Sequence, residues 1–172
     1  RQDFEVAKLI GWESHNAGAF SEARLWFARA TQWQPDEEST YGLALSYLSL
    51  DEPDNAEQTI RAFQPQSDRL RTLLGRVLER QDNVQYEQGH YDASLRYLDE
   101  ANALEPLSRS GRLLRAWVFF AEQQYIAAAD HFEDLYREQP DDNSAQGVFH
   151  SNLALDNEAA IAEIVAESGG PL

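Results

Sequence analysis

The chain has 172 residues, of which 42% are hydrophobic and 26% are charged, a balance typical of a folded protein rather than a disordered one. It carries 30 acidic residues against 14 basic ones, and its net charge of −16 opposes binding to nucleic acid or to anionic lipid, because both are polyanions. There is no Cys, which excludes disulfides, thiolate nucleophiles and Cys-ligated zinc.

The first predicted element is an antiparallel pair of helices that ends at Pro35. Small and apolar residues recur three or four positions apart on either side of a break at Ala17-Gly18. Small residues at a helix crossing let the two backbones approach closely, and a Pro cannot continue the second helix. The residues that set this period are Ala7, Ile10, Gly11 and Ser14, followed by Ala23, Phe27 and Ala30.

A less regular helix pair is predicted next, from about Glu37, and after it the spacing lengthens. From Pro65 to Gly89 is 24 residues, seven more than the equivalent distance later in the chain, and seven residues are about two helical turns. An apolar stripe continues through the extra residues, so we predict one overlong helix near 67–88 rather than a loop. The stripe consists of Leu70, Leu73, Leu74, Val77 and Leu78.

The first and last thirds of the chain read as copies of one module. Trp12 and Trp117 are 105 residues apart, and the same offset superposes Phe27 on Phe132. Eight identities at one offset indicate an internal duplication. The other six pairs are Pro35 and Pro140, Gly42 and Gly147, Ser46 and Ser151, Leu48 and Leu153, Leu50 and Leu155, and Asp51 and Asp156.

These motifs resemble the second half of the tetratricopeptide repeat, with its small residue, aromatic residue, small residue and Pro at fixed intervals. The resemblance covers nearly the whole chain and implies an all-α fold, a right-handed α-solenoid of about five antiparallel helix pairs. The residues that carry it are Gly18 to Ala23 with Phe27, Ala30 and Pro35; Gly89-His90-Tyr91 with Ser94, Leu98, Ala101 and Pro106; and Tyr125, Ala128, Phe132 and Pro140, with Leu135 where a second Ala is usual.

The repeats divide the chain into consecutive segments. The expected segments are repeats 1–2 in 1–66, an extended repeat 3 in 67–106, repeat 4 in 107–140, a partial or terminal repeat 5 in 141–168, and a tail in 169–172. The chain opens Arg1-Gln2-Asp3 without an initiating Met, so we expect it to be part of a longer protein.

The resemblance places a ligand on the concave side of the solenoid, which the first helix of each pair lines. Trp12 and Trp117 occupy equivalent positions there, and aromatic side chains offer a large contact area at low entropic cost. The alternative is that both rings pack against the neighbouring repeat as core. The candidate partner-binding residues are Trp12, His15, Tyr41, Leu45, Arg76, Arg80, Tyr86, Trp117 and Phe120.

An Arg stripe is a second candidate site. At ~100° per residue, Arg69, Arg76 and Arg80 fall within about 20° of one line on the overlong helix. Guanidinium groups in such a line could hold a carboxylate or another anion through bidentate hydrogen bonds. The alternative is simple ion pairing with Glu79, Glu87 and the acids of adjacent repeats.

No convergent catalytic or metal-binding motif is present in the sequence. The four His residues lie in separate helices or turns, and none has a second His or a carboxylate at metal-ligand spacing. The stretch Asp141-Asp142-Asn143 resembles part of a calcium loop, but it lacks the Gly and final Glu of that loop and favours a turn with a helix N-cap. We therefore predict no enzyme activity, no metal and no cofactor.

The predicted function is a non-enzymatic scaffold that binds a protein or peptide partner, with a polysaccharide as a second candidate, and that does not insert into a membrane. The chain is similar to periplasmic tetratricopeptide arrays of exopolysaccharide export, such as cellulose synthase operon protein C, in being acidic, Cys-free and irregularly spaced. That resemblance implies a bacterial periplasm and a larger envelope protein. The alternatives are a cytoplasmic adaptor or chaperone-like peptide binder, and a spacer that self-associates through the last repeat at Ile161, Ile164 and Val165.

Overall fold

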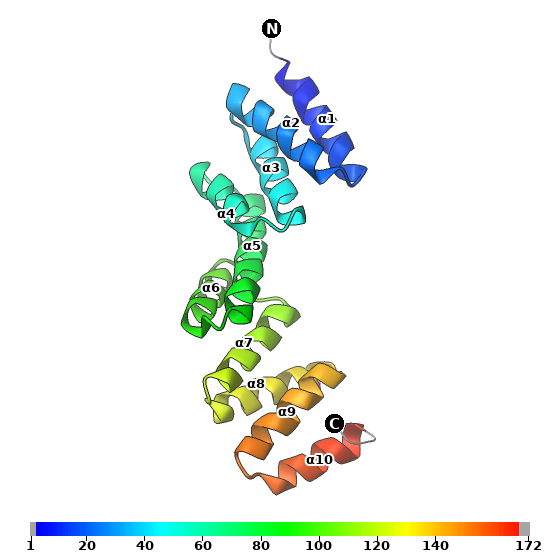
Figure 1. Ribbon diagram of the computed structural model, residues 1–172, viewed down its shortest axis with the longest axis vertical. Helices are drawn as coiled ribbons and strands as arrows, with labels where there is room; N and C mark the ends of the chain where they lie inside the picture. The colour runs from blue at the N-terminus through cyan, green and yellow to red at the C-terminus, as the bar shows by residue number, and fades with distance from the viewer. Residues whose placement is uncertain (1–2, 169–172) are drawn as a thin grey trace. The chain divides into compact units, whose positions relative to one another are not determined.

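A computed structural model describes residues 3–168, and within that range the chain forms ten α-helices and no β-strand (Figure 1). The all-α class predicted from the sequence is confirmed, and the predicted tail 169–172 lies outside the described residues. The helices are α1 (Phe4–Asn16), α2 (Phe20–Trp33), α3 (Glu37–Ser49), α4 (Pro53–Ala62), α5 (Asp68–Glu87), α6 (Tyr91–Leu104), α7 (Arg109–Ala121), α8 (Tyr125–Glu138), α9 (Asp142–Ala154) and α10 (Glu158–Ser168).

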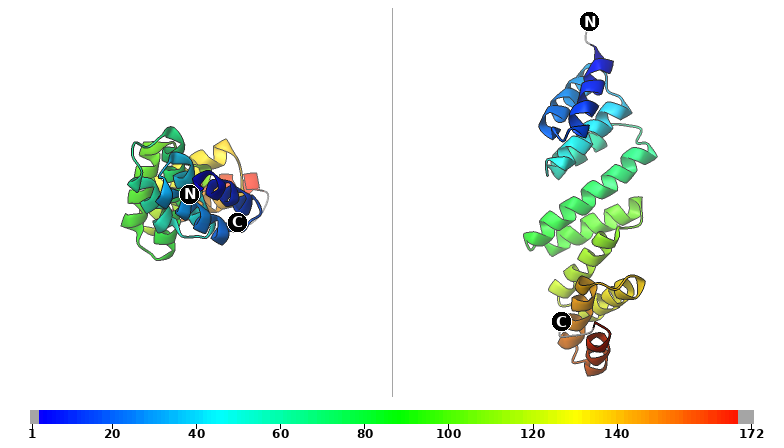
Figure 2. Two further views of the ribbon diagram at one scale, coloured as in Figure 1. Left: turned by 90° about the horizontal axis from the view of Figure 1, so that it is seen from above. Right: turned by 90° about the vertical axis from the view of Figure 1, so that its right-hand side faces the viewer.

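The chain divides into two compact units. The first runs to Gln81 and includes Glu100–Glu105, and the second comprises Asp82–Asp99 and continues from Pro106. In the first unit α1 packs on α2, α2 on α3 and α3 on α4, while α7 to α10 pack in the same order in the second (Figure 2). The first helices of successive pairs also touch, α1 with α3 and α7 with α9. This shared order is what the offset of 105 residues predicts.

Short polar side chains start the helices that open each pair. Asp36 Oδ1 accepts a hydrogen bond from the Ser39 backbone N–H at 2.7 Å, and Asp141 Oδ1 accepts one from the Ser144 backbone N–H at 2.8 Å. Each carboxylate thereby satisfies a donor that a helix N-terminus leaves without an intrahelical partner. The turn between α1 and α2 passes through Gly18 at φ +76°, a conformation that favours glycine.

Within each unit, a buried Phe on one helix lies directly against a Gly on the next helix. Phe27 on α2 has no exposed surface, and a Cβ built on Gly42 of α3 would lie 2.5 Å from its ring. The equivalent Cβ on Gly147 of α9 would lie 2.2 Å from the ring of Phe132. The glycines are therefore present because the ring occupies the space where a side chain would begin.

The overlong helix is confirmed as α5, which spans Asp68–Glu87 without interruption. Its predicted apolar stripe is buried, with Leu70, Val77 and Leu78 at 0% exposure. The stripe therefore serves as core along the helix.

Candidate partner-binding faces

The first-unit aromatic face consists of Trp12, His15, Phe20 and Tyr41, all of them partly exposed. The Trp12 ring meets the buried Phe27 ring edge-on at 4.9 Å between centroids, and it lies 5.9 Å from His15 and 6.4 Å from Tyr41. His15 continues the row to Phe20 at 5.1 Å. Trp12 thus packs against the buried Phe27 ring on one side. His15, Phe20 and Tyr41, all partly exposed, form a row of rings beside it.

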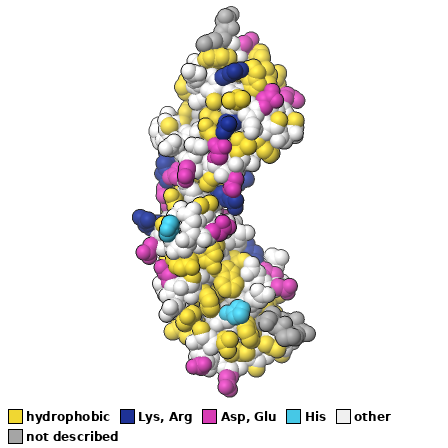
Figure 3. All heavy atoms as spheres, in the orientation of Figure 1, with side chains coloured by type: hydrophobic (Ala, Val, Ile, Leu, Met, Phe, Trp, Pro, Cys, Tyr) yellow, Lys and Arg dark blue, Asp and Glu magenta, His cyan; other side chains and the backbone are white. Residues whose placement is uncertain are grey.

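The second-unit aromatic face consists of Trp117, Phe120, Tyr125 and His150. Its ring spacings match those of the first unit: Trp117 is 4.6 Å from Phe132 and 5.8 Å from Phe120, and Phe120 is 5.4 Å from Tyr125. Phe120 also lies 6.4 Å from the exposed His150. Figure 3 shows hydrophobic side chains gathered over α7 and α9, the helices that carry most of this face.

Each indole is held by the helix that opens the next pair. Trp12 Nε1 donates a hydrogen bond to Glu38 Oε1 at 3.1 Å, and Trp117 Nε1 donates one to Asn143 Oδ1 at 3.1 Å. These two acceptors are themselves 105 residues apart. A ring whose N–H is already bonded presents an oriented apolar surface with little conformational freedom left to lose.

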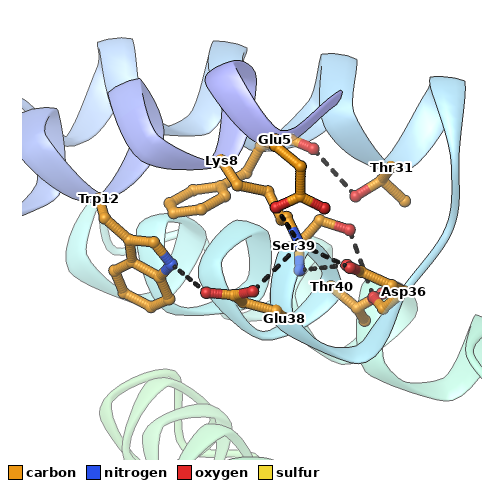
Figure 4. A network of polar contacts seen from close by, with 9 residues as sticks. Glu5, Lys8, Trp12, Thr31, Asp36, Glu38, Ser39 and Thr40 are labelled. Carbon is orange, nitrogen blue, oxygen red and sulfur yellow. Dashed lines mark hydrogen bonds and ion pairs between the residues drawn. The ribbon is translucent and has the colours of Figure 1, made fainter. Parts of the chain in front are cut away.

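The only Lys of the chain anchors the first-unit face (Figure 4). Lys8 Nζ donates hydrogen bonds to Asp36 at 3.0 Å and Glu38 at 3.1 Å, and pairs with Glu5 at 3.3 Å. Burial by itself lowers the pKa of Lys8, but these carboxylates outweigh burial, so its pKa is raised and the ammonium stays charged. Lys8 therefore connects α1 to the N-terminus of α3 and holds the acceptor of Trp12.

The second unit uses another residue for the same connection. Position 113, which corresponds to Lys8, is Leu, and Arg109 one turn earlier pairs with the N-cap Asp141 at 2.6 Å. Arg109 also donates to the carbonyl of Gln139 at 2.8 Å, near the end of α8. Each unit thus places one cation against the carboxylate that starts its second pair.

The pKa values of His15 on the first-unit face and of His131 elsewhere in the second unit are both lowered. Burial lowers the pKa of His15, which favours the neutral ring among its aromatic neighbours. Elsewhere in the second unit, burial and the nearby Arg115 lower the pKa of His131, against an opposite effect of Asp134 and Asp130. His131 stacks on Phe119 at 5.2 Å, a packing position rather than a place on the face.

The predicted Arg stripe lies on the first-unit part of α5. The Arg69 guanidinium lies over the Tyr41 ring, 3.7 Å from its centroid, and Arg80 pairs with Asp51 at 2.7 Å. Arg76 is exposed. Anion binding by this stripe stays a prediction, and two of its three cations have a partner within the unit.

Leu45 and Tyr86, two further residues predicted to bind a partner, take no part in the rows of rings described above. Leu45 is partly buried on α3, and Tyr86 on α5 contacts Tyr91 at 5.7 Å. Burial and the neighbouring Tyr91 raise the pKa of Tyr86. Their part in binding stays a prediction.

The sequence reasoning missed Phe20 and Tyr125, which complete the two rows of rings. It assigned the ligand to the first helix of each pair, whereas these residues open the second helices. The signal was available, because both are aromatic and stand 105 residues apart. Tyr125 also borders an open hollow of about 460 Å³ whose other lining residues include Ile126, Asp130 and Leu155.

The last helix is partly covered by its own unit. Ile164 is 3% exposed and packs with Phe132 and Val148, while Ile161 and Val165 are partly buried. Self-association through this face stays a prediction. Across residues 3–168 there is no group of three or more His, Cys, Asp or Glu that could hold a metal ion, and none of the helices there is long and apolar enough to cross a membrane.

Residues 83–143 match the family model described as tetratricopeptide repeat. The match confirms the resemblance over α6 to α8 and the residues on either side of them. Among curated protein sequences, none matches this chain.

Solved structures share the fold at low sequence identity. A crystal structure of MamA protein is 14% identical, with 96% of this chain and 89% of that chain covered at a TM-score of 0.70. MamA 41-end from Desulfovibrio magneticus RS-1 is 15% identical, with 97% and 93% covered at 0.67. A tetratricopeptide repeat protein from Parabacteroides merdae ATCC 43184 is 15% identical, with 98% and 66% covered at 0.57. The predicted tetratricopeptide-type α-solenoid fold is confirmed.

Proposed function

We propose that this chain is a non-enzymatic interaction scaffold whose aromatic faces bind a segment of a protein partner. The fold supports the general role, since tetratricopeptide solenoids present side chains on stacked helices for contact with other molecules. A fold alone does not specify a ligand, so the proposal depends on the faces themselves.

The observation that carries the proposal is the duplication of one half-exposed ring arrangement. Trp12 and Trp117 lie at matching distances from their core Phe rings and donate matching hydrogen bonds of 3.1 Å. If these two indoles served only as core, each could be fully buried. Rings that are oriented in advance and remain partly exposed are the kind of anchor that dominates protein interfaces.

The surroundings of the second-unit face favour a partner with an apolar side chain next to the ring contact. Ile126 is 69% exposed and Leu155 is 38% exposed, and both line the hollow beside Tyr125. Large apolar side chains at this exposure gain free energy when a partner covers them.

The test begins with selection of peptides from a displayed random library against the full chain. For each selected peptide, affinity is then measured for wild type, Trp12→Leu and Trp117→Leu. We expect at least one of the two substitutions to weaken binding by about 30-fold or more, as for interface anchors that contribute at least ~2 kcal/mol.

The control is Trp26→Leu, which removes a partly buried indole of α2 that lies beneath Arg29 and not on the face. Unchanged affinity in both face variants, or an equal loss in the control, would contradict the proposal. Far-UV circular dichroism of every variant shows whether the helices are intact.

A place in a bacterial envelope machine for cellulose export, and with it a periplasmic location, stays a prediction from sequence resemblance. Neither the family match nor the similar structures described above support it. A polysaccharide ligand is tested in the same assay, by adding soluble cello-oligosaccharides and following Trp fluorescence. A cytoplasmic adaptor would give the peptide result without the sugar result.

A further inference from the structure

The first-unit aromatic face already has a cation of its own. The Arg69 guanidinium lies 3.7 Å from the centre of the Tyr41 ring, which in turn contacts Trp12. A guanidinium is attracted to the negative face of an aromatic ring and stacks on it through its own plane. Part of this face is therefore occupied within the chain.

The second-unit aromatic face has no such cation. Within the described part of the chain, no Lys or Arg lies over Trp117 or Phe120, and each Arg from α7 onward is engaged elsewhere. The pairs are Arg109 with Asp141 at 2.6 Å, Arg112 with Glu138 at 2.7 Å, Arg115 with Asp99 at 2.6 Å, and Arg137 with Glu133 at 2.7 Å. Position 146, which corresponds to Tyr41, is Gln, and the Trp117 and Phe120 rings carry no cation from within the described part of the chain.

The charge around this face would attract a cation from outside. Residues 116–172 contain 11 acidic residues and a single basic one, Arg137. Asp130 lines the hollow beside Tyr125, next to the row of rings. A surface with this excess of negative charge accelerates association with a basic segment and opposes an acidic one.

We infer that the second-unit aromatic face binds an Arg side chain presented by a basic segment of a protein partner. This inference rests on the proposed function and adds the chemistry of the ligand. The guanidinium stacks on Trp117 and Phe120, as Arg69 does on Tyr41, and the neighbouring residues of the segment lie toward the hollow at Ile126. Arg is favoured over Lys because its planar, weakly hydrated head group stacks on a ring, whereas an ammonium is a compact, strongly hydrated charge.

The experiment uses the peptides selected against the full chain. Each Arg in a selected peptide is replaced in turn by citrulline, which keeps the size and planarity of the side chain and removes its charge. We expect enrichment of Arg among the selected sequences, and one citrulline position that weakens binding by about 10-fold or more. Trp117→Leu and, separately, Phe120→Leu should abolish that difference between the Arg and citrulline peptides.

Trp12→Leu is the matched control, because it removes the equivalent ring from the face that already has Arg69. It should change affinity for the Arg peptide by less than about twofold, whereas Trp117→Leu should reduce it by about 30-fold or more. Phe120→Leu is the smaller change. If Trp117→Leu unfolds the second unit, the loss of affinity for the Arg peptide is measured with Phe120→Leu instead.

The outcomes separate the two proposals. If peptides bind but citrulline or Lys replaces every Arg without loss, or if Trp12→Leu is the damaging variant, the Arg site is wrong and the scaffold proposal stands. If no peptide can be selected, the scaffold proposal itself fails. If the selected peptides are acidic, the charge argument for this face is overturned.

Discussion

Replacing Gly147 by Ala should destabilise the second unit although Ala is the better helix former. The added Cβ would lie 2.2 Å from Cδ1 and 2.3 Å from Cγ of Phe132, well inside van der Waals contact. Phe132 has no exposed surface, and Trp117 packs on it at 4.6 Å, so any movement of the ring would disturb its packing against this neighbour. Overpacking of this kind costs about 3 kcal/mol at the upper end, and helix propensity returns about 1 kcal/mol.

The expected net loss is therefore about 2 kcal/mol in the free energy of unfolding. The assay is urea unfolding followed by far-UV circular dichroism, with the midpoint converted to free energy through the slope of the transition. The matched control is Gly75→Ala on α5, where a Cβ would meet nothing within 4 Å. That change should stabilise the protein by up to ~1 kcal/mol through helix propensity alone.

A double variant isolates the contact. Phe132→Leu creates space beside residue 147, so Gly147→Ala should cost less in that background than in wild type, with a coupling of roughly 1 kcal/mol or more. The reasoning would be refuted if Gly147→Ala were as stable as Gly75→Ala. It would also fail if the cost of Gly147→Ala were the same with Leu at position 132.

Three further changes test the electrostatics of the units. Asp141→Ala should cost ~1 kcal/mol in urea unfolding, because it removes the N-cap of α9; an unchanged midpoint would contradict this. Lys8→Leu should lower the free energy of unfolding by roughly 1 kcal/mol. Adding Glu38→Asn, which places at this position the residue found at position 143 of the second unit, should recover part of that loss. A further loss in the double variant would contradict coupling between Lys8 and Glu38. The pKa of His131 is lowered in the folded state, so the stability that this histidine contributes is fully present above about pH 6.5 and is lost as the pH falls from there toward the folded pKa. His131→Phe should therefore flatten the dependence of unfolding free energy on pH in that window. An unaltered pH profile would count against this prediction.

Local pattern was sufficient to predict most of the fold. The period of small and apolar residues, the breaks at Gly18 and Gly89 and the unbroken Leu stripe of α5 each depend on neighbours in sequence, so they could be read without the structure. The offset of 105 residues added the duplication. It paired Gly42 with Gly147 and Phe27 with Phe132, but the close approach of each Gly to its Phe came from the structure.

The contacts of the faces could be predicted only in part. The sequence indicated Trp12 and Trp117 as equivalent candidates, but not that Glu38 and Asn143 accept their indole hydrogen bonds, because those acceptors come from the next helix pair. The position of Arg69 over Tyr41 likewise depends on the angle at which two helices meet. Such details follow from three-dimensional packing rather than from any local period.

The most direct test of the scaffold proposal is the fluorescence of Trp117 alone. A variant with Phe at Trp12, Trp26 and Trp33 leaves this single indole, and acrylamide quenching is measured with and without a selected peptide. A partly exposed ring that anchors a partner should emit toward the red, be quenched in the free protein and become shielded when the peptide binds. Emission toward the blue with strong protection in the free protein, unchanged by peptide, would show that Trp117 is core and that the partner binds elsewhere.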